Sequence, residues 1–203
     1  MPSKRSGPQS GLTSLELLRT PPPKERADAA RNRAAILAAA ARLFAEHGVE
    51  SVSMDAIAAA AGVGKGTLFR RFGDKAGLAV ALLDHREGEL QEAILSGPPP
   101  LGPDAAAAER ATAFTEAYLD YLFAHLDLVR MSETAAPGAR YRIGAYRFWH
   151  RHLTLLFGGD GEFRAHALLA ALGAEHVTAL LPELGEERLR AQTVRLAAAL
   201  AAG

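Results

Sequence analysis

The fold is decided by residues 53–72, which read SMDAIAAAAGVGKGTLFRRF. Ser53 is a good N-cap for a short helix over residues 54–61, and Gly62 stands where that helix should end. A tight turn then leads into a second short helix over residues 65–72. Two short helices joined by a glycine turn can cross steeply, which leaves the second helix free to enter the major groove of DNA. This segment predicts a helix-turn-helix.

The side chains of the second predicted helix divide into an inner and an outer set. Leu68 and Phe72 lie four residues apart and are expected to anchor the helix to a core. The outward or sideways set is rich in donors that can meet a phosphate or a guanine edge. It consists of Lys65, Thr67, Arg70 and Arg71.

The run from Gly62 to Thr67 also looks like part of a phosphate-binding P-loop. That motif needs Gly-x-x-x-x-Gly-Lys followed directly by Ser or Thr, after a strand. Here Gly66 follows Lys65, residue 59 is alanine, and the preceding segment is a predicted helix. The sequence therefore argues against a nucleotide site in this segment.

Composition favours helix along the whole chain of 203 residues, because alanine is very frequent and β-branched residues are sparse. We predict an all-α fold with a three-helix DNA-binding domain over residues 25–73, a helical bundle over 74–203 and a flexible tail over 1–24. Apolar spacing and Gly or Pro breaks predict no strand and about nine helices. Their approximate ranges are 27–47, 54–61, 65–72, 74–95, 104–125, 128–133, 141–155, 162–181 and 186–202.

Several classes of protein are disfavoured by what the sequence lacks. It contains no cysteine, which excludes disulfides, thiolate metal sites and cysteine nucleophiles. His150 and His152 lie two residues apart, on opposite sides of a helix, so they cannot chelate one metal ion together. We find no catalytic arrangement of residues, no signal peptide and no apolar run long enough to cross a bilayer. We therefore expect a cytoplasmic protein that is not an enzyme and has no metal, cofactor or membrane partner.

The net charge is zero, but the two halves of the chain differ. Residues 1–84 carry twelve Lys and Arg against eight Asp and Glu, whereas residues 85–203 carry eleven against fifteen. This asymmetry is expected when only one end of a protein meets phosphate. The N-terminal tail is either unstructured or an arm through which Arg26, Arg31 or Arg33 reaches the DNA backbone or minor groove.

A longer pattern of apolar, glycine and basic positions surrounds the predicted helix-turn-helix. It reads ILxAAxxLFAExG from Ile36 to Gly48 and SMxxIAxxAGVGKGTLFxxFxxKxxL from Ser53 to Leu78. In this pattern the chain closely resembles the DNA-binding domain of the TetR family of regulators. The resemblance implies a sequence-specific regulator, and we expect a homodimeric, ligand-released repressor that binds an inverted-repeat operator in double-stranded DNA.

The resemblance also implies which residues contact DNA, although three positions depart from the family pattern. Phe69 replaces a usual tyrosine, Arg71 a usual histidine and Gly64 a usual serine cap, which moves phosphate binding toward Lys65, Thr67, Arg71 and Lys75. An alternative of another class, a helical small-molecule carrier or interaction protein that has lost useful DNA binding, stays open because of Gly64 and Phe69. The predicted DNA-binding residues are Ser53, Lys65, Gly66, Thr67, Phe69, Arg70, Arg71 and Lys75.

Ten of the thirteen aromatic residues lie between residues 114 and 163. Such a cluster is either ordinary core packing or the lining of a pocket for a small molecule, and the family resemblance favours a pocket for an unknown effector. The predicted ligand-binding residues are Phe114, Tyr118, Tyr121, Tyr146, Trp149 and His150.

The last two predicted helices carry broad apolar faces interspersed with small residues. These faces are either buried within the monomer or used between two copies of the chain. The family resemblance implies the second use, in which the two helices of each copy form a four-helix bundle.

Overall fold

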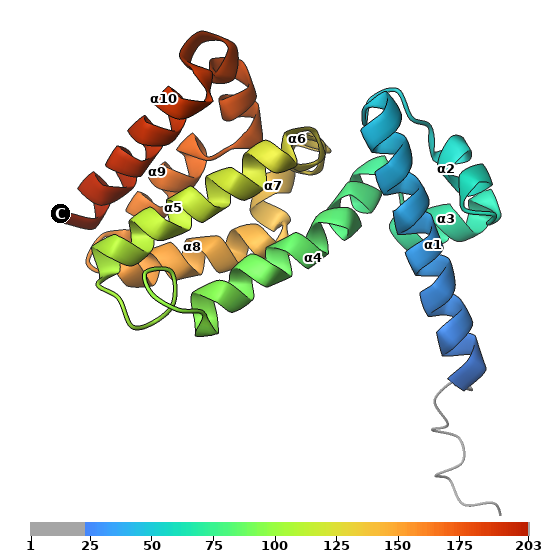
Figure 1. Cartoon of the computed structure of the whole chain (residues 1–203), viewed down its shortest axis with the longest axis horizontal. Helices are drawn as coiled ribbons and strands as arrows, with labels where there is room; N and C mark the ends of the chain where they lie inside the picture. The colour runs from blue at the N-terminus through green and yellow to red at the C-terminus, as the bar shows by residue number, and fades with distance from the viewer. Residues whose placement is uncertain (1–22, 203) are drawn as a thin grey trace, which may run out of the picture.

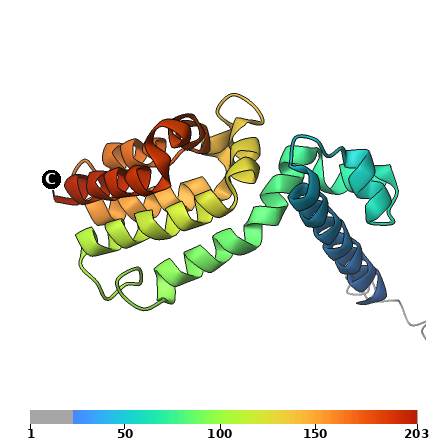
Figure 2. The same cartoon turned by 45° about the horizontal axis from the view of Figure 1, so that its top comes forward.

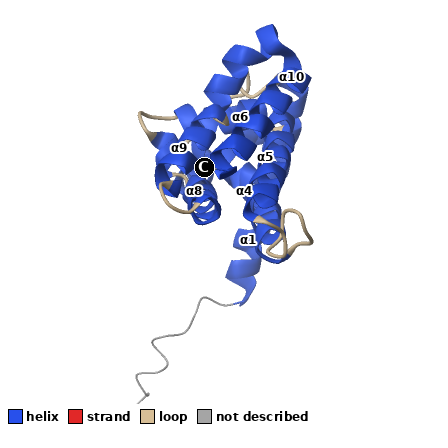
Figure 3. Ribbon diagram, turned by 90° about the vertical axis from the view of Figure 1, so that its left-hand side faces the viewer, coloured by secondary structure: helices blue, strands red, loops and turns tan. Residues whose placement is uncertain are grey.

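The computed structural model describes residues 23–202, and over that range the protein is all-helical, as predicted (Figure 3). The described residues form ten helices and no strand. These are α1 (Pro23–His47), α2 (Met54–Ala60), α3 (Lys65–Phe72), α4 (Lys75–Ser96), α5 (Ala107–Ala124), α6 (Leu126–Thr134), α7 (Ala139–Arg142), α8 (Gly144–Phe157), α9 (Gly161–Ala171) and α10 (Ala174–Ala202).

Helices α1, α2 and α3 gather at one end of the molecule around a small core of their own (Figure 1). Ile36 of α1, Ile57 of α2 and Leu68 of α3 are each fully buried there. Burying one such side chain contributes roughly 1.5–3 kcal/mol. The other members of this core are Ala40, Phe44, Val49, Val52, Ala58 and Leu78.

Helix α4 joins this unit to the rest of the chain without interruption (Figure 2). The Asp74 side chain caps its first turn by accepting the Gly77 N–H at 2.8 Å, as the sequence predicts. Leu78 belongs to the N-terminal core, whereas Leu83 and Ile94 belong to the C-terminal one. A single rigid helix therefore runs from one core into the other.

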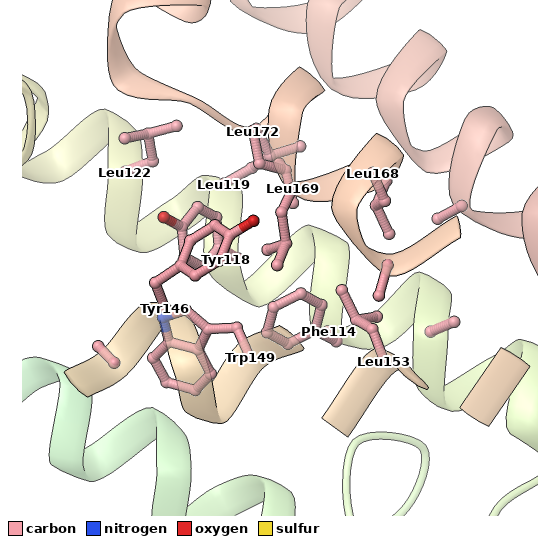
Figure 4. Packing of buried hydrophobic residues seen from close by; sticks show 14 of the residues in the cluster. Phe114, Tyr118, Leu119, Leu122, Tyr146, Trp149, Leu153, Leu168, Leu169 and Leu172 are labelled. Atoms are coloured by element: carbon pink, nitrogen blue, oxygen red, sulfur yellow. The ribbon is translucent and has the colours of Figure 1, made fainter. Parts of the chain in front are cut away.

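The C-terminal helices α5 to α10 pack around a second, larger core (Figure 4). Aromatic side chains of α5 and α8 meet leucines of α9 in it; Phe114, Leu153 and Leu168 are fully buried. Leu172 and Val177, which belong to the apolar part of the last helices, are buried in this core as well, so they are used within the monomer.

Three helix boundaries differ from the predicted ones. Helix α1 already begins at Pro23, within the predicted tail, whose residues 1–22 lie outside the described range. Helix α5 begins at Ala107 rather than Asp104, because the Glu109 carboxylate accepts the Ala106 N–H at 3.2 Å and caps the helix from within. The predicted helix over 141–155 is divided at Ile143, whose backbone is extended (φ −65°, ψ 133°).

The C-terminal helices are also interrupted at a position that the sequence does not predict. Gly185 has φ 72° and ψ 161° and interrupts α10 where a break was predicted. A further break separates α9 from α10 at Gly173, where an added Cβ would lie 2.7 Å from Arg140 Nη1. This glycine lets the Arg140 guanidinium approach the backbone, a requirement that depends on a distant residue.

Within residues 23–202 no single helix is long and apolar enough to span a membrane. Helices α9 and α10 meet that length and apolarity only as a pair, and they are bent by 53° at their junction.

Candidate DNA-binding surface and ligand cavity

Helices α2 and α3 form the predicted helix-turn-helix. Ser53 caps α2, since its Oγ accepts the Ala56 N–H at 3.1 Å. Helix α2 ends beside Gly62, whose φ of 66° lies in the left-handed region that glycine adopts without steric cost. The Val63 N–H then donates to the Ala58 carbonyl at 3.0 Å and closes the turn.

Helix α3 is anchored on one side and exposed on the other. Leu68 is fully buried and Phe72 half-buried, as predicted from their spacing. Lys65, Phe69 and Arg70 are exposed, and 45% of the Phe69 surface is open although the side chain is apolar. Thr67 is half-buried between the two sides. The outer face of α3 thus combines cationic groups with an exposed aromatic ring.

The two cations on this face have different surroundings. Lys65 forms an ion pair with Asp55 in the first turn of α2, a partner that the sequence analysis did not identify. Arg70 has neither a hydrogen bond nor an ion pair with any described residue. Its guanidinium is therefore available to an anion or a base edge.

Gly64 and Gly66 at the start of α3 are not required by packing within the chain. An added Cβ at either position meets no atom within 4 Å. Gly64 is the N-cap and provides no side-chain hydrogen bond, so no side chain of the cap residue satisfies the first N–H groups of α3. Such groups can approach a phosphate closely.

Arg71 and Lys75 turn back toward the protein. Arg71 donates to the Ala29 carbonyl of α1. The Lys75 Nζ donates to the carbonyls of Val49, Glu50 and Val52 at 2.9, 3.0 and 3.1 Å. These three bonds use every N–H of the ammonium group. Both residues hold α1 and the loop after it, and the phosphate contacts expected of them stay predictions.

Four of the six predicted ligand-binding residues line one small cavity: Tyr118, Tyr121, Tyr146 and Trp149. Its volume is about 20 Å³, which is room for about one water molecule. Glu87, Glu133 and Arg140 bring charge to its wall, together with Val129, Ser132, Ile143 and Ala145.

Phe114 and His150 do not line this cavity. Phe114 is a core residue whose ring centroid lies 5.8 Å from that of Trp149 and 5.6 Å from that of His152. His150 lies with its centroid 3.9 Å from that of His166. The described residues contain no group of three or more potential metal ligands.

Glu133 and Arg140 form an almost buried ion pair, with side chains 8% and 13% exposed. Arg140 Nε lies 3.0 Å from Glu133 Oε1, although its N–H does not point at an acceptor. The Ala174 N–H, in the first turn of α10, donates to Glu133 Oε2 at 2.8 Å. Burial raises the pKa of Glu133, and the Arg140 charge opposes that rise.

Glu87 reaches the same cavity from α4 with a different set of partners. The Tyr121 hydroxyl donates to Glu87 Oε1 at 2.8 Å. Burial raises the pKa of Glu87, and the nearby charges of Asp84 and Glu133 raise it further. No ion pair joins it to a cation among residues 27–202, whose side chains the structure describes. The sequence held a signal for this site, because Glu87 interrupts the apolar stripe of Leu83, Leu90 and Ile94 on α4.

Helix α6 lies between the cavity and the N-terminal unit. Val129, Ser132 and Glu133 line the cavity. Leu128 and Met131 pack against the N-terminal core, and Leu128 also contacts the C-terminal one. Arg130 forms an ion pair with Glu50 of the loop between α1 and α2, at 3.8 Å. This helix of nine residues therefore contacts both parts of the molecule.

A larger hollow of about 580 Å³ lies where α1, α4 and the junction of α5 and α6 meet. Its lining is mainly apolar and includes Phe44, Leu82 and Phe123, with Arg86 and His125 at its polar part. None of the predicted ligand-binding residues lines it.

Comparison with known proteins bears on both parts of the chain. A family model described as bacterial regulatory proteins, tetR family, matches residues 36–82. An HTH-type transcriptional regulator of Staphylococcus aureus (strain USA300) is 51% identical over 53 residues, which span 26% of this chain and only 29% of the relative. This likeness is confined to about the length of a helix-turn-helix domain.

Solved structures resemble the chain over most of its length. A TetR-family transcriptional regulator from Pectobacterium atrosepticum has a TM-score of 0.61 at 24% identity and covers 84% of this chain and 92% of its own. A regulator of the TetR/AcrR family from Thermobifida fusca has a TM-score of 0.59 at 21% identity, with coverages of 82% and 96%. At these identities the likeness concerns the fold, from the helix-turn-helix through the C-terminal bundle.

Proposed function

Because the chain belongs to the TetR family of bacterial regulatory proteins, we propose that it is a homodimeric repressor that binds an inverted-repeat operator and is released by a small ligand. The outer face of α3 carries this proposal: it exposes Lys65, Phe69 and Arg70 on a helix held from behind by Leu68. A regulator of this kind acts in the cytoplasm, where the DNA is.

In the proposed complex α3 lies in the major groove. Arg70 contacts a phosphate or a guanine edge, and Phe69 packs on a sugar or a thymine methyl group. Gly66 supports this geometry because it leaves the backbone open on the face that would meet DNA. Lys65 binds phosphate after exchanging its exposed partner Asp55 for it, a small loss since exposed ion pairs contribute little. Ser53 and Thr67 add hydroxyl contacts from the flanks.

The proposed dimer uses the part of the last two helices that the monomer leaves uncovered. Ala191, Ala198 and Ala202 are exposed and follow one stripe of α10, where small side chains allow close helix packing. Phe163 of α9 is 78% exposed and Leu196 of α10 is 37% exposed. A second copy of the chain would remove this apolar surface from water, and its two-fold symmetry would match an inverted repeat.

The proposed release runs through α6 and α4. A ligand that enlarges the cavity would press on Val129 and Glu133, and both belong to the helix that contacts the N-terminal unit through Leu128 and Arg130. A ligand that binds the displaced arrangement better shifts the population toward it. The spacing of the two recognition helices then no longer fits two half-sites.

The test is selection of bound sequences from fragments of the source genome, followed by fluorescence anisotropy on the selected duplex and a scrambled one. We expect preferential binding to the selected duplex, weakened by Arg70→Ala. Arg151→Ala, an exposed arginine of α8 in the other unit, is the matched control and should bind as the unchanged protein does. Equal affinity for both duplexes would refute the proposal.

A further inference from the structure

We propose that the ligand of the aromatic cavity is an organic cation, whose ammonium group binds beside Glu87 among the rings of Tyr118, Tyr121, Tyr146 and Trp149. This inference rests on the proposed function and names the chemical class of its effector. It follows from the charges, the walls and the size of the cavity.

The charges of the cavity are not balanced within the described part of the chain. Glu133 has a guanidinium and a backbone N–H as partners, so the Glu133–Arg140 pair is neutral as a unit. Glu87 has the neutral hydroxyl of Tyr121 as its hydrogen-bond donor. A half-buried carboxylate without a cation is costly, and a cationic ligand would remove that cost. A neutral or anionic ligand would not.

The walls of the cavity suit a cation as well. The centroids of Tyr118 and Tyr121 are 5.6 Å apart, and those of Tyr118 and Trp149 are 6.1 Å apart, both in edge-to-face arrangement. Figure 4 shows the side chains of Tyr118, Tyr146 and Trp149 gathered between α5 and α8. The guanidinium of Arg140 already lies 5.3 Å from the Tyr146 ring centroid. The faces of such rings attract ammonium groups.

The cavity must expand to hold such a ligand, because its present volume is about 20 Å³. One wall of the cavity is α7, a helix of four residues that carries Arg140. It begins after Gly138 in the left-handed region (φ 69°) and ends at the extended Ile143. Arg140 ties this short helix to Glu133 and to the Leu169 carbonyl, so binding of the ligand would have to compensate for the loss of those contacts if α7 moves. Displacing α7 also pulls on α6, to which it is joined.

The single tryptophan of the chain provides a direct measurement, since Trp149 lines the cavity. The full-length protein is titrated with choline and with its neutral isostere 3,3-dimethylbutan-1-ol, and Trp149 emission is followed. We expect a saturable change of Trp149 emission with choline and at least about tenfold weaker binding of the alcohol, because the faces of the aromatic rings attract the ammonium group and not its neutral isostere.

The decisive variant is Glu87→Gln, which keeps the shape of the side chain and removes its charge. It should bind choline at least about tenfold more weakly and the alcohol unchanged, since an opposite charge near the ammonium is lost. Glu89→Gln removes an exposed carboxylate of the same helix and should behave as the unchanged protein. Thermal unfolding checks that each variant is folded, and Glu87→Gln should melt no lower than the unchanged protein.

Three results would overturn the inference: equal affinity for choline and the alcohol, undiminished choline binding by Glu87→Gln, or no change in Trp149 emission. Calorimetric binding of choline without a Trp149 response would place it elsewhere, such as the hollow beside Phe44, and also counts against the inference. Operator binding by the unliganded protein is measured separately. If that binding is intact while choline has no effect, this inference fails and the proposed function stands.

Discussion

Replacing Lys75 with methionine separates two roles of this residue. The family resemblance expects it to bind phosphate, whereas in the structure its Nζ donates to three main-chain carbonyls of the segment between α1 and α2. The bonds to Val49 and Val52 are partly buried, and the bond to Glu50 is exposed. With about 1 kcal/mol net for each partly buried bond and little for the exposed one, Lys75→Met should lower the free energy of unfolding by roughly 2 kcal/mol.

The assays for Lys75→Met are urea unfolding and the salt dependence of operator binding. We expect a lower midpoint with the same m-value. An unchanged slope of log K against log salt would assign Lys75 the structural role alone, and a reduced slope would show that it also binds phosphate. Arg70→Met is the control, with unchanged stability and a slope reduced by roughly 0.9 for one phosphate. Unchanged stability of Lys75→Met together with a reduced slope would refute the structural role.

Three further predictions concern other parts of the molecule. Gly66→Ala should stabilise α3 by about 1 kcal/mol in urea unfolding, because alanine favours helix. It should also weaken operator binding, because it places a methyl group on the DNA-facing side. Unchanged operator affinity would contradict a close approach of the α3 backbone to DNA. Burial of His152 lowers its pKa to about 4. The folded protein therefore favours the neutral imidazole, and the resulting stability is complete above about pH 6.5. It is lost as the pH falls toward 4, by up to about 3 kcal/mol. Urea unfolding of His152→Gln between pH 7 and 4 should show a correspondingly smaller loss, and an identical pH dependence would contradict it. Ala198→Glu should convert the proposed dimer into monomers in size-exclusion chromatography, because a charge without a partner is costly in an interface; a persistent dimer would exclude this stripe from the contact.

The helix-turn-helix could be predicted from the sequence because its signals are local. The Ser53 cap, the Gly62 turn and the spacing of Leu68 and Phe72 all act within about ten residues, and the predicted range of α3 agrees with the structure. The aromatic cavity was also anticipated in part, since Tyr118 and Tyr121 share one helix stripe. The spacing of apolar residues along a helix indicates which of them face inward, and that information is sufficient to predict the helix-turn-helix and part of the cavity lining.

What the sequence did not reveal depends on contacts between distant segments. The glycine at the break between α9 and α10 is required by Arg140, more than thirty residues earlier, whose guanidinium approaches the backbone at Gly173. Main-chain groups also position Glu133, Arg140 and Lys75. These groups are the Ala174 N–H and the carbonyls of Leu169 and Val49, and a pattern of side chains in the sequence does not indicate them. Phe114 belongs to the same aromatic cluster as Tyr118 and Tyr121, but clustering along the sequence does not distinguish a core position such as Phe114 from the two tyrosines that line the cavity.

If α3 reads a specific DNA sequence, the protein must distinguish its operator from other DNA. The ratio of affinities for the selected operator and a scrambled duplex, measured by anisotropy at several salt concentrations between about 50 and 200 mM, shows this. We expect a ratio of at least about a thousandfold, with log K for the operator falling linearly with log salt. Equal affinities, or affinities that do not change with salt, would contradict it.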